Sequence, residues 1–147
     1  MHTTSETIIS LAADGHVSFA ITDNTLQAAI LEKVGKAHGI TFSALQAGAL
    51  ENLPYLSTSI NELPGLLITS ATTHQALLSA HQKSVLSYSQ LVECVAYTKM
   101  LAPVLTAYPT SFLLAINAET DASKVMHLIS MLQGQGINHF SLSAHDN

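Results

Sequence analysis

Two short apolar runs open the chain, at residues 7–12 and 16–21, and the dipeptide Asp14-Gly15 lies between them. An Asp-Gly pair readily adopts the positive φ angles that a tight hairpin turn needs. The pattern therefore predicts two antiparallel strands joined at this dipeptide. This hairpin is the first element of the expected sheet.

An apolar stripe with helical spacing follows the hairpin. Asn24 stands three residues before Gln27, where the stripe begins, and Gly39 stands where it ends. A polar residue three positions before a glutamine is typical of a helix N-terminus, and glycine commonly follows a helix C-terminus. The spacing predicts a helix over 24–38.

The same start signal, a hydroxyl residue three positions before a glutamine, predicts three more helices. The pairs are Ser43 with Gln46, Thr72 with Gln75, and Ser87 with Gln90. The last pair precedes a segment that is apolar on most faces, which predicts a central helix over 88–102. Residues 51–65 contain two prolines and a glycine and are expected to form a loop, and residues 65–70 are expected to form a buried strand.

The closing segment changes from a strand pattern to a helix pattern and back. Residues 111–117 and 137–142 are expected to be strands, and the apolar positions between them have helical spacing: Val125, Leu128, Ile129 and Leu132. Gly134 and Gly136 follow this helix instead of preceding one, so they predict a C-cap and not a phosphate-binding loop. A strand-helix-strand unit of this length normally forms a right-handed parallel crossover.

Together these elements predict an α/β (α+β) fold with a mixed sheet of about four to five strands. The sheet would contain the N-terminal hairpin and the C-terminal βαβ unit, with a helical middle between them. A chain of 147 residues suits a single domain over 1–147. Residues 40–108 form a candidate helical insertion in that domain.

Three charged residues, Glu119, Asp121 and Lys124, follow the strand expected at 111–117. Aspartate is a favoured N-cap residue and a helix N-terminus attracts carboxylates, so Asp121 is expected to cap the next helix. The alternative is a ligand site, because open α/β sheets bind ligands at the carboxyl ends of their parallel strands.

A second polar corner, with Thr72, Thr73 and His74, follows the strand expected at 65–70. In the alternative interpretation the two corners line one cleft, where a small molecule binds or reacts. No serine lies in a G-x-S-x-G nucleophile elbow, however, and no Ser-His-Asp group can be assembled from the sequence. We therefore assign no catalytic residue and favour a protein that is not an enzyme.

The histidine and cysteine positions argue against metal and thiol chemistry. None of the eight histidines is three or four residues from another, and His74 and His81, on one expected helical segment, are seven residues apart. That spacing places them roughly 10 Å apart along a helix axis, too far for one metal ion. Cys94 lies among apolar residues and is expected in the core. We expect neither a metal nor a cofactor.

The small number of charges narrows the possible partners. Charged residues make up only 10% of the chain, the net charge is -5, and no arginine is present. Few cations remain to neutralise a phosphate backbone, so nucleic acid is not an expected partner. No apolar run reaches the roughly 18 residues that a membrane helix needs, and residues 1–10 lack the pattern of a signal peptide. A surface with so few charges suggests that a partner covers part of it.

Two passages resemble the periplasmic domain of the ExbD/TolR family, small proteins of proton-driven energy-transduction complexes in bacterial envelopes. The segment from Ile8 to Ala20 is similar to the family's first hairpin, with an acidic-Gly turn between two strands. Residues 113–144 resemble its closing unit, a strand ending in an Ala-acid pair, an apolar helix, Gly-Ile and a last strand. The pair here is Ala118-Glu119, where Asp is the more usual acid.

The resemblance implies a non-enzymatic interaction domain that serves biopolymer transport, including protein transport, in the periplasm. Such a domain would form a homodimer and engage an envelope protein, and it would reach the membrane only through a helix that this chain does not contain. Its last strand would pair at the sheet edge with a second copy or a partner. Without the resemblance, we expect a cytoplasmic protein with the small-molecule site described above.

Overall fold

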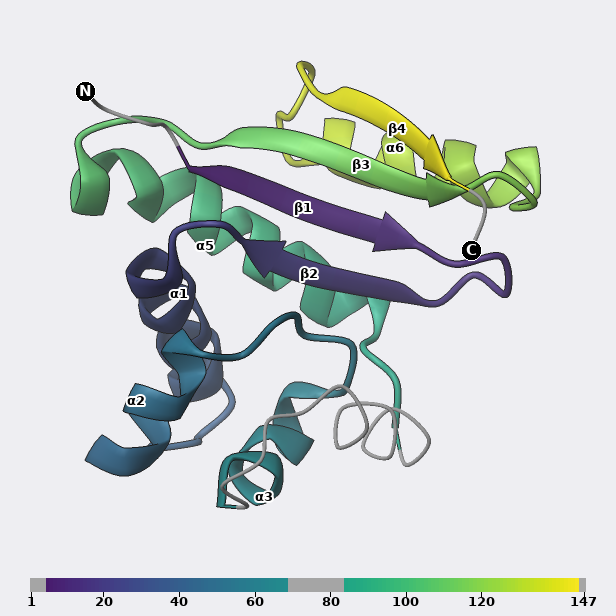
Figure 1. Cartoon of the computed structure of the whole chain (residues 1–147). Helices are drawn as coiled ribbons and strands as arrows, with labels where there is room; N and C mark the ends of the chain where they lie inside the picture. Colours follow the sequence, from purple (N-terminus) through teal and green to yellow (C-terminus); the bar gives the residue numbers. More distant parts are fainter. Residues whose placement is uncertain (1–4, 69–83, 146–147) are drawn as a thin grey trace.

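A four-stranded mixed sheet forms the centre of the protein (Figure 1). The structure is a computed structural model that describes residues 5–68 and 84–145. The strands are β1 (Glu6–Leu11), β2 (Val17–Ile21), β3 (Ser111–Asn117) and β4 (Ser141–His145), in the order β2-β1-β3-β4. The predicted α/β (α+β) fold with a mixed sheet is therefore confirmed.

The pairing of the strands follows the expected hairpin and closing unit. β1 is antiparallel to β2, and Gly15 in the turn between them has a φ of 93°, a conformation that glycine adopts without strain. β1 is parallel to β3, and β3 is parallel to β4. The chain leaves β3 for α6 (Ala122–Gly134) and returns as β4, which confirms the strand-helix-strand order.

Only one face of the sheet is deeply buried. Alternate residues of β1, β2 and β3 have exposed fractions between 0 and 9%, including Ile9, Phe19, Leu114 and Ile116. Figure 1 shows α5 (Tyr88–Thr106) and α6 behind the sheet, on this face. The side chains between these positions, such as Ser10, point to the opposite face, which carries none of the labelled helices in Figure 1.

The predicted helix starts are confirmed where the structure describes them. Before α2 (Ala44–Glu51), Ser43 and Gln46 form a reciprocal capping box, and Ser87 caps α5 through the backbone N–H of Gln90. The start at Thr72 lies outside the described residues. α1 (Asn24–Ala37) also begins as expected, but the residue that caps it is Asp23, which accepts from the Leu26 N–H.

The strand predicted at 65–70 is wrong over 65–68, and residues 69 and 70 lie outside the described part of the chain. Residues 63–68 form helix α3 (Leu63–Ile68), which follows a 3-10 turn, η1 (Ile60–Glu62), within the segment expected to be a loop. Leu63, Leu66 and Leu67 are all buried, at the i, i+3, i+4 spacing of one helix face. A short apolar run cannot distinguish a buried strand from a buried helix turn by its pattern alone, which explains the error.

Two further boundaries differ from the prediction. α5 does not end before Pro103 but continues to Thr106, with the proline on an exposed part of the helix surface. The last strand lies at 141–145 and not at 137–142, because the buried Ile137 closes the end of α6: its N–H donates to the Leu132 carbonyl. Gly136, with a φ of 80°, makes that turn as a C-cap glycine, as predicted.

Candidate functional site

The acidic corner after β3 is built around the start of α6. Asp121 occupies the N-cap position, as predicted, but its side chain makes no capping hydrogen bond. The Glu119 N–H donates to Asn117 Oδ1 at 2.9 Å, and Lys124 Nζ donates to the Ala13 carbonyl at 3.4 Å. Lys124 thereby connects the corner to the hairpin turn, and Glu119 and Lys124 contribute to local structure.

The other half of the predicted cleft lies outside the described residues. Thr72, Thr73 and His74 belong to the segment between 68 and 84 that the structure does not describe. A shared cleft between these residues and Glu119, Asp121 and Lys124 therefore stays a prediction.

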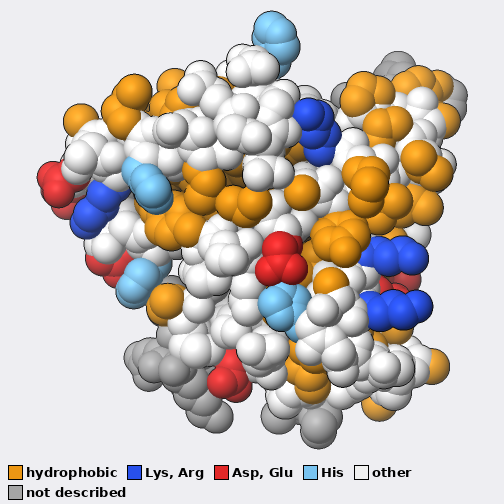
Figure 2. Space-filling model, turned by 180° about the vertical axis from the view of Figure 1, so that it is seen from behind, with side chains coloured by type: hydrophobic (Ala, Val, Ile, Leu, Met, Phe, Trp, Pro, Cys, Tyr) orange, Lys and Arg blue, Asp and Glu red, His pale blue; other side chains and the backbone are white. Residues whose placement is uncertain are grey.

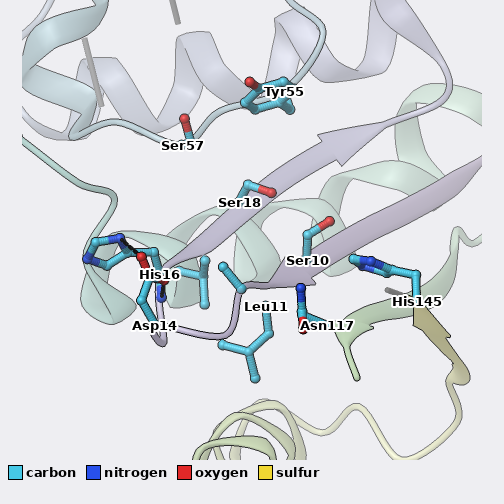
Figure 3. Close-up of a pocket in the computed structure, with 11 residues that line it drawn as sticks. Ser10, Leu11, Asp14, His16, Ser18, Tyr55, Ser57, Asn117 and His145 are labelled. Atoms are coloured by element: carbon cyan, nitrogen blue, oxygen red, sulfur yellow. Dashed lines mark hydrogen bonds and ion pairs between the residues drawn. The ribbon is translucent and has the colours of Figure 1, made fainter. Parts of the chain in front are cut away.

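A cavity of about 250 Å³ lies close to this corner, at the carboxyl ends of β1 and β3. We call it the strand-end cavity (Figure 3). Its polar lining comes from four parts of the chain, the β1–β2 hairpin, the segment 55–57, β3 and β4: Ser10, Asp14, His16, Ser18, Tyr55, Ser57, Asn117 and His145. Leu11, Ala12 and Val17 complete it.

Strand pairing brings the polar side chains together. Ser10 stands opposite Ser18 across the hairpin, and Asn117 stands beside His145 in the parallel pair of β3 and β4. Ser10, Ser18 and Asn117 alternate with the buried positions of their strands, so they project from the face opposite the helices, and His145 lies on the same face because it pairs with Asn117.

The segment 55–57 forms the remaining wall. Leu56 pairs with Phe19 of β2 through two backbone hydrogen bonds of 2.9 and 2.7 Å, and both side chains are buried on the helix-covered side. Because neighbouring residues of an extended segment point to opposite sides, Tyr55 and Ser57 project toward the cavity. Burial raises the pKa of Tyr55 above 10.0, so its hydroxyl keeps its proton at neutral pH.

Two ionisable side chains of the cavity, Asp14 and His16, lie beside each other. His16 Nδ1 lies 3.1 Å from Asp14 Oδ2, and the His16 backbone N–H donates to Asp14 Oδ1 at 3.0 Å. Figure 3 shows this pair on one side of the cavity, away from Ser10 and His145. No lysine is among the lining residues that the structure describes. Both oxygens of the Asp14 carboxylate therefore have a contact within the hairpin turn, and the described lining contains no lysine or arginine.

The sequence predictions placed Asp14 in the hairpin turn and Asn117 at the end of a strand, and they assigned neither these two nor the other lining residues to a site. The available signal was the alternation of serine with apolar residues in both hairpin strands. That alternation also fits an ordinary solvent-exposed sheet face, so it could not distinguish a binding site from such a face.

Cys94 is a core residue, as predicted. Its side chain is fully buried, and burial together with the nearby Glu93 carboxylate raises the pKa of the thiol to about 12. A thiol with so high a pKa is a poor nucleophile at neutral pH. Among the described residues no group of three or more His, Cys, Asp or Glu side chains could hold a metal ion.

Exposed apolar side chains occur outside the cavity on β4 and on α5. All five residues of β4 are exposed at the edge of the sheet, including Leu142 at 60%. On the helix-covered side, Met100, Val104 and Leu105 of α5 are exposed, and Figure 2 shows hydrophobic side chains gathered on that side.

No described helix is long and apolar enough to cross a membrane. Comparisons of the chain with protein-family models, with curated proteins and with solved structures found no match.

Proposed function

We propose that this protein is a non-enzymatic interaction domain, resembling the ExbD/TolR periplasmic domain, which associates through the free edge of β4. The observation that carries the proposal is the exposure of every residue in β4. An uncovered edge strand presents unpaired N–H and C=O groups that can pair with another chain. The primary partner is a second copy of the chain, and an envelope protein is the further partner.

The backbone geometry of β4 identifies the groups that are free to pair. The His145 carbonyl accepts from the Ala118 N–H at 2.8 Å, so the backbone groups of His145 point toward β3. Since these groups alternate in direction along a strand, those of Leu142 and Ala144 point away from the sheet. A partner strand would bond to these two residues and contact the exposed Leu142 side chain.

The opposite edge of the sheet is less accessible. β2 pairs with Leu56, and the Ser57 carbonyl accepts from the Leu86 N–H, so further chain adjoins that edge. Natural proteins commonly cover or charge their edge strands to prevent association, yet β4 contains no lysine and no acidic residue. This contrast supports β4 as the edge that associates.

Sedimentation velocity over a range of protein concentrations tests the homodimer. Leu142→Lys places a charge on the edge and should weaken dimerisation by about tenfold or more, since charged edge residues oppose strand pairing. Leu45→Lys is the matched control, because Leu45 is 81% exposed on α2, away from β4. A chain that stays monomeric at all concentrations, or two variants with the same effect, would contradict the proposal.

The envelope location needs a separate experiment. In fractionated native cells, an immunoblot should detect the gene product in the membrane fraction, with an apparent mass well above the 15.6 kDa of this chain. A soluble cytoplasmic product near that mass would count against the periplasmic and transport roles. The dimer experiment would then still decide whether β4 associates.

A further inference from the structure

We propose that the strand-end cavity binds a small neutral carbonyl compound with an apolar ring. The binding site is separate from the outward edge of β4 and does not depend on the proposed interaction function. It has two parts: hydrogen-bond donors on the open face of the sheet, and an apolar wall near the hairpin turn.

Asn117 provides the main donor. Its Oδ1 already accepts from the Glu119 N–H at 2.9 Å, which orients the amide and turns its NH₂ group the other way. Figure 3 shows the Asn117 nitrogen on the side of Ser10, with His145 nearby. An NH₂ group beside a serine hydroxyl is suited to bind a carbonyl oxygen.

The charge of the lining favours a neutral ligand. No lysine or arginine is among the described residues that line the cavity, so an anion would lose its hydration there without gaining an ionic partner from them. The carboxylate among the described lining residues, Asp14, already accepts a hydrogen bond from the His16 backbone N–H and has the His16 ring beside its other oxygen, so both of its oxygens have a contact within the hairpin turn. A neutral carbonyl group requires neither kind of compensation.

The apolar wall and the size of the cavity define the rest of the ligand. Ala12 and the ring of Tyr55 supply the apolar part of the wall, and Leu11 and Val17 adjoin the cavity with side chains that are buried on the helix-covered face. Its volume of about 250 Å³ is below the roughly 300–1,000 Å³ of pockets for drug-sized ligands, so a single ring with one polar substituent is the appropriate size.

Three probes of nearly the same shape test this charge preference: benzamide is neutral, benzoate is anionic and benzamidine is cationic. Each is titrated into the full chain, and binding is followed by NMR of the backbone amides. Benzamide should shift the amides of Ser10, Ser18, Asn117 and His145, and should bind about tenfold more tightly than either charged probe. No saturable shift with any probe up to about 10 mM, where a millimolar site would be occupied, would overturn the proposal. So would a charged probe that binds as tightly as benzamide.

Asn117→Asp tests the donor without removing its structural bond. The new carboxylate still accepts from the Glu119 N–H but no longer donates to a carbonyl oxygen. Benzamide binding should weaken about tenfold, and benzamidine should become the preferred probe. Asn138→Asp makes the same charge change at an exposed residue that does not line the cavity, and should leave the order of probes unchanged. Equal effects of the two substitutions would overturn the role of Asn117.

Discussion

Gln27 connects three segments of the protein and provides a sharp test of how the fold is stabilised. This residue of α1 is only 2% exposed. Its Oε1 accepts from the Ile21 N–H at 2.8 Å, and its Nε2 donates to the Leu53 carbonyl at 2.7 Å. The side chain therefore joins α1 to the end of β2 and to the loop after α2.

Gln27→Met keeps the length of the side chain and removes both bonds. The Ile21 N–H and the Leu53 carbonyl then remain buried beside an apolar group, at a cost of about 1–3 kcal/mol for each. Since methionine is itself well suited to a buried position, we expect a net loss of about 3 kcal/mol in the free energy of unfolding. The loss would be a large fraction of the total stability of a domain of this size.

Urea unfolding followed by circular dichroism measures this loss, provided that the slope of the transition is unchanged. The control is Gln133→Met on the exposed surface of α6, which should change stability by less than about 0.5 kcal/mol. Hydrogen exchange at Ile21 should also become faster in Gln27→Met. A loss below about 1 kcal/mol, with unchanged exchange at Ile21, would refute the role of the two bonds.

Three further predictions concern the core, the backbone and a helix-helix contact. Cys94 should resist thiol reagents in the native state. Burial holds its folded pKa near 12 against 9.0 for an exposed thiol, so the free energy of unfolding should fall more steeply above pH 9 in the parent protein than in Cys94→Ala. Equal pH profiles of the two proteins would contradict this. Ala107 has a φ of 68°, so Ala107→Gly should raise the free energy of unfolding by about 0.5–1 kcal/mol. Gly39 has a φ of 79°, so Gly39→Ala should lower it by a similar amount. Thermal or urea unfolding measures both changes. His38 Nε2 lies 2.9 Å from Glu93 Oε1, between α1 and α5. A double-mutant cycle should give a coupling free energy between the two side chains of roughly 0.2–1 kcal/mol, and this energy should decrease with salt. A coupling free energy that salt does not change would exclude an ionic contribution.

Local signals in the sequence predicted the elements that they control directly. The Asp14-Gly15 pair predicted the hairpin, and Ser43 and Ser87 predicted the first residues of two helices, because turn and cap preferences act over three or four neighbouring residues. The errors have the same origin. The pattern at 65–70 is too short to distinguish a strand from a helix, and contacts with the rest of the core decide the outcome.

The candidate site was less accessible to prediction than the fold. Asp121 was placed at the N-cap of α6, but its carboxylate makes no bond there. The strand-end cavity went unrecognised because its walls come from residues as distant in sequence as Ser10, Tyr55 and His145. Nothing near Tyr55 in the sequence indicates that Leu56 pairs with Phe19, and that pairing is what turns Tyr55 toward the cavity.

The sequence by itself thus determined the hairpin, the closing strand-helix-strand order and the apolar character of Cys94, all of which depend on neighbouring residues and on side-chain hydrophobicity. Only the tertiary structure decided which edge of the sheet is free and which polar side chains share a cavity. The coverage of β2 by Leu56, the exposure of β4 and the grouping of Ser10 with Asn117 depend on pairing between distant segments. Such pairing is selected by the packing of the whole core and leaves no periodic pattern in the chain.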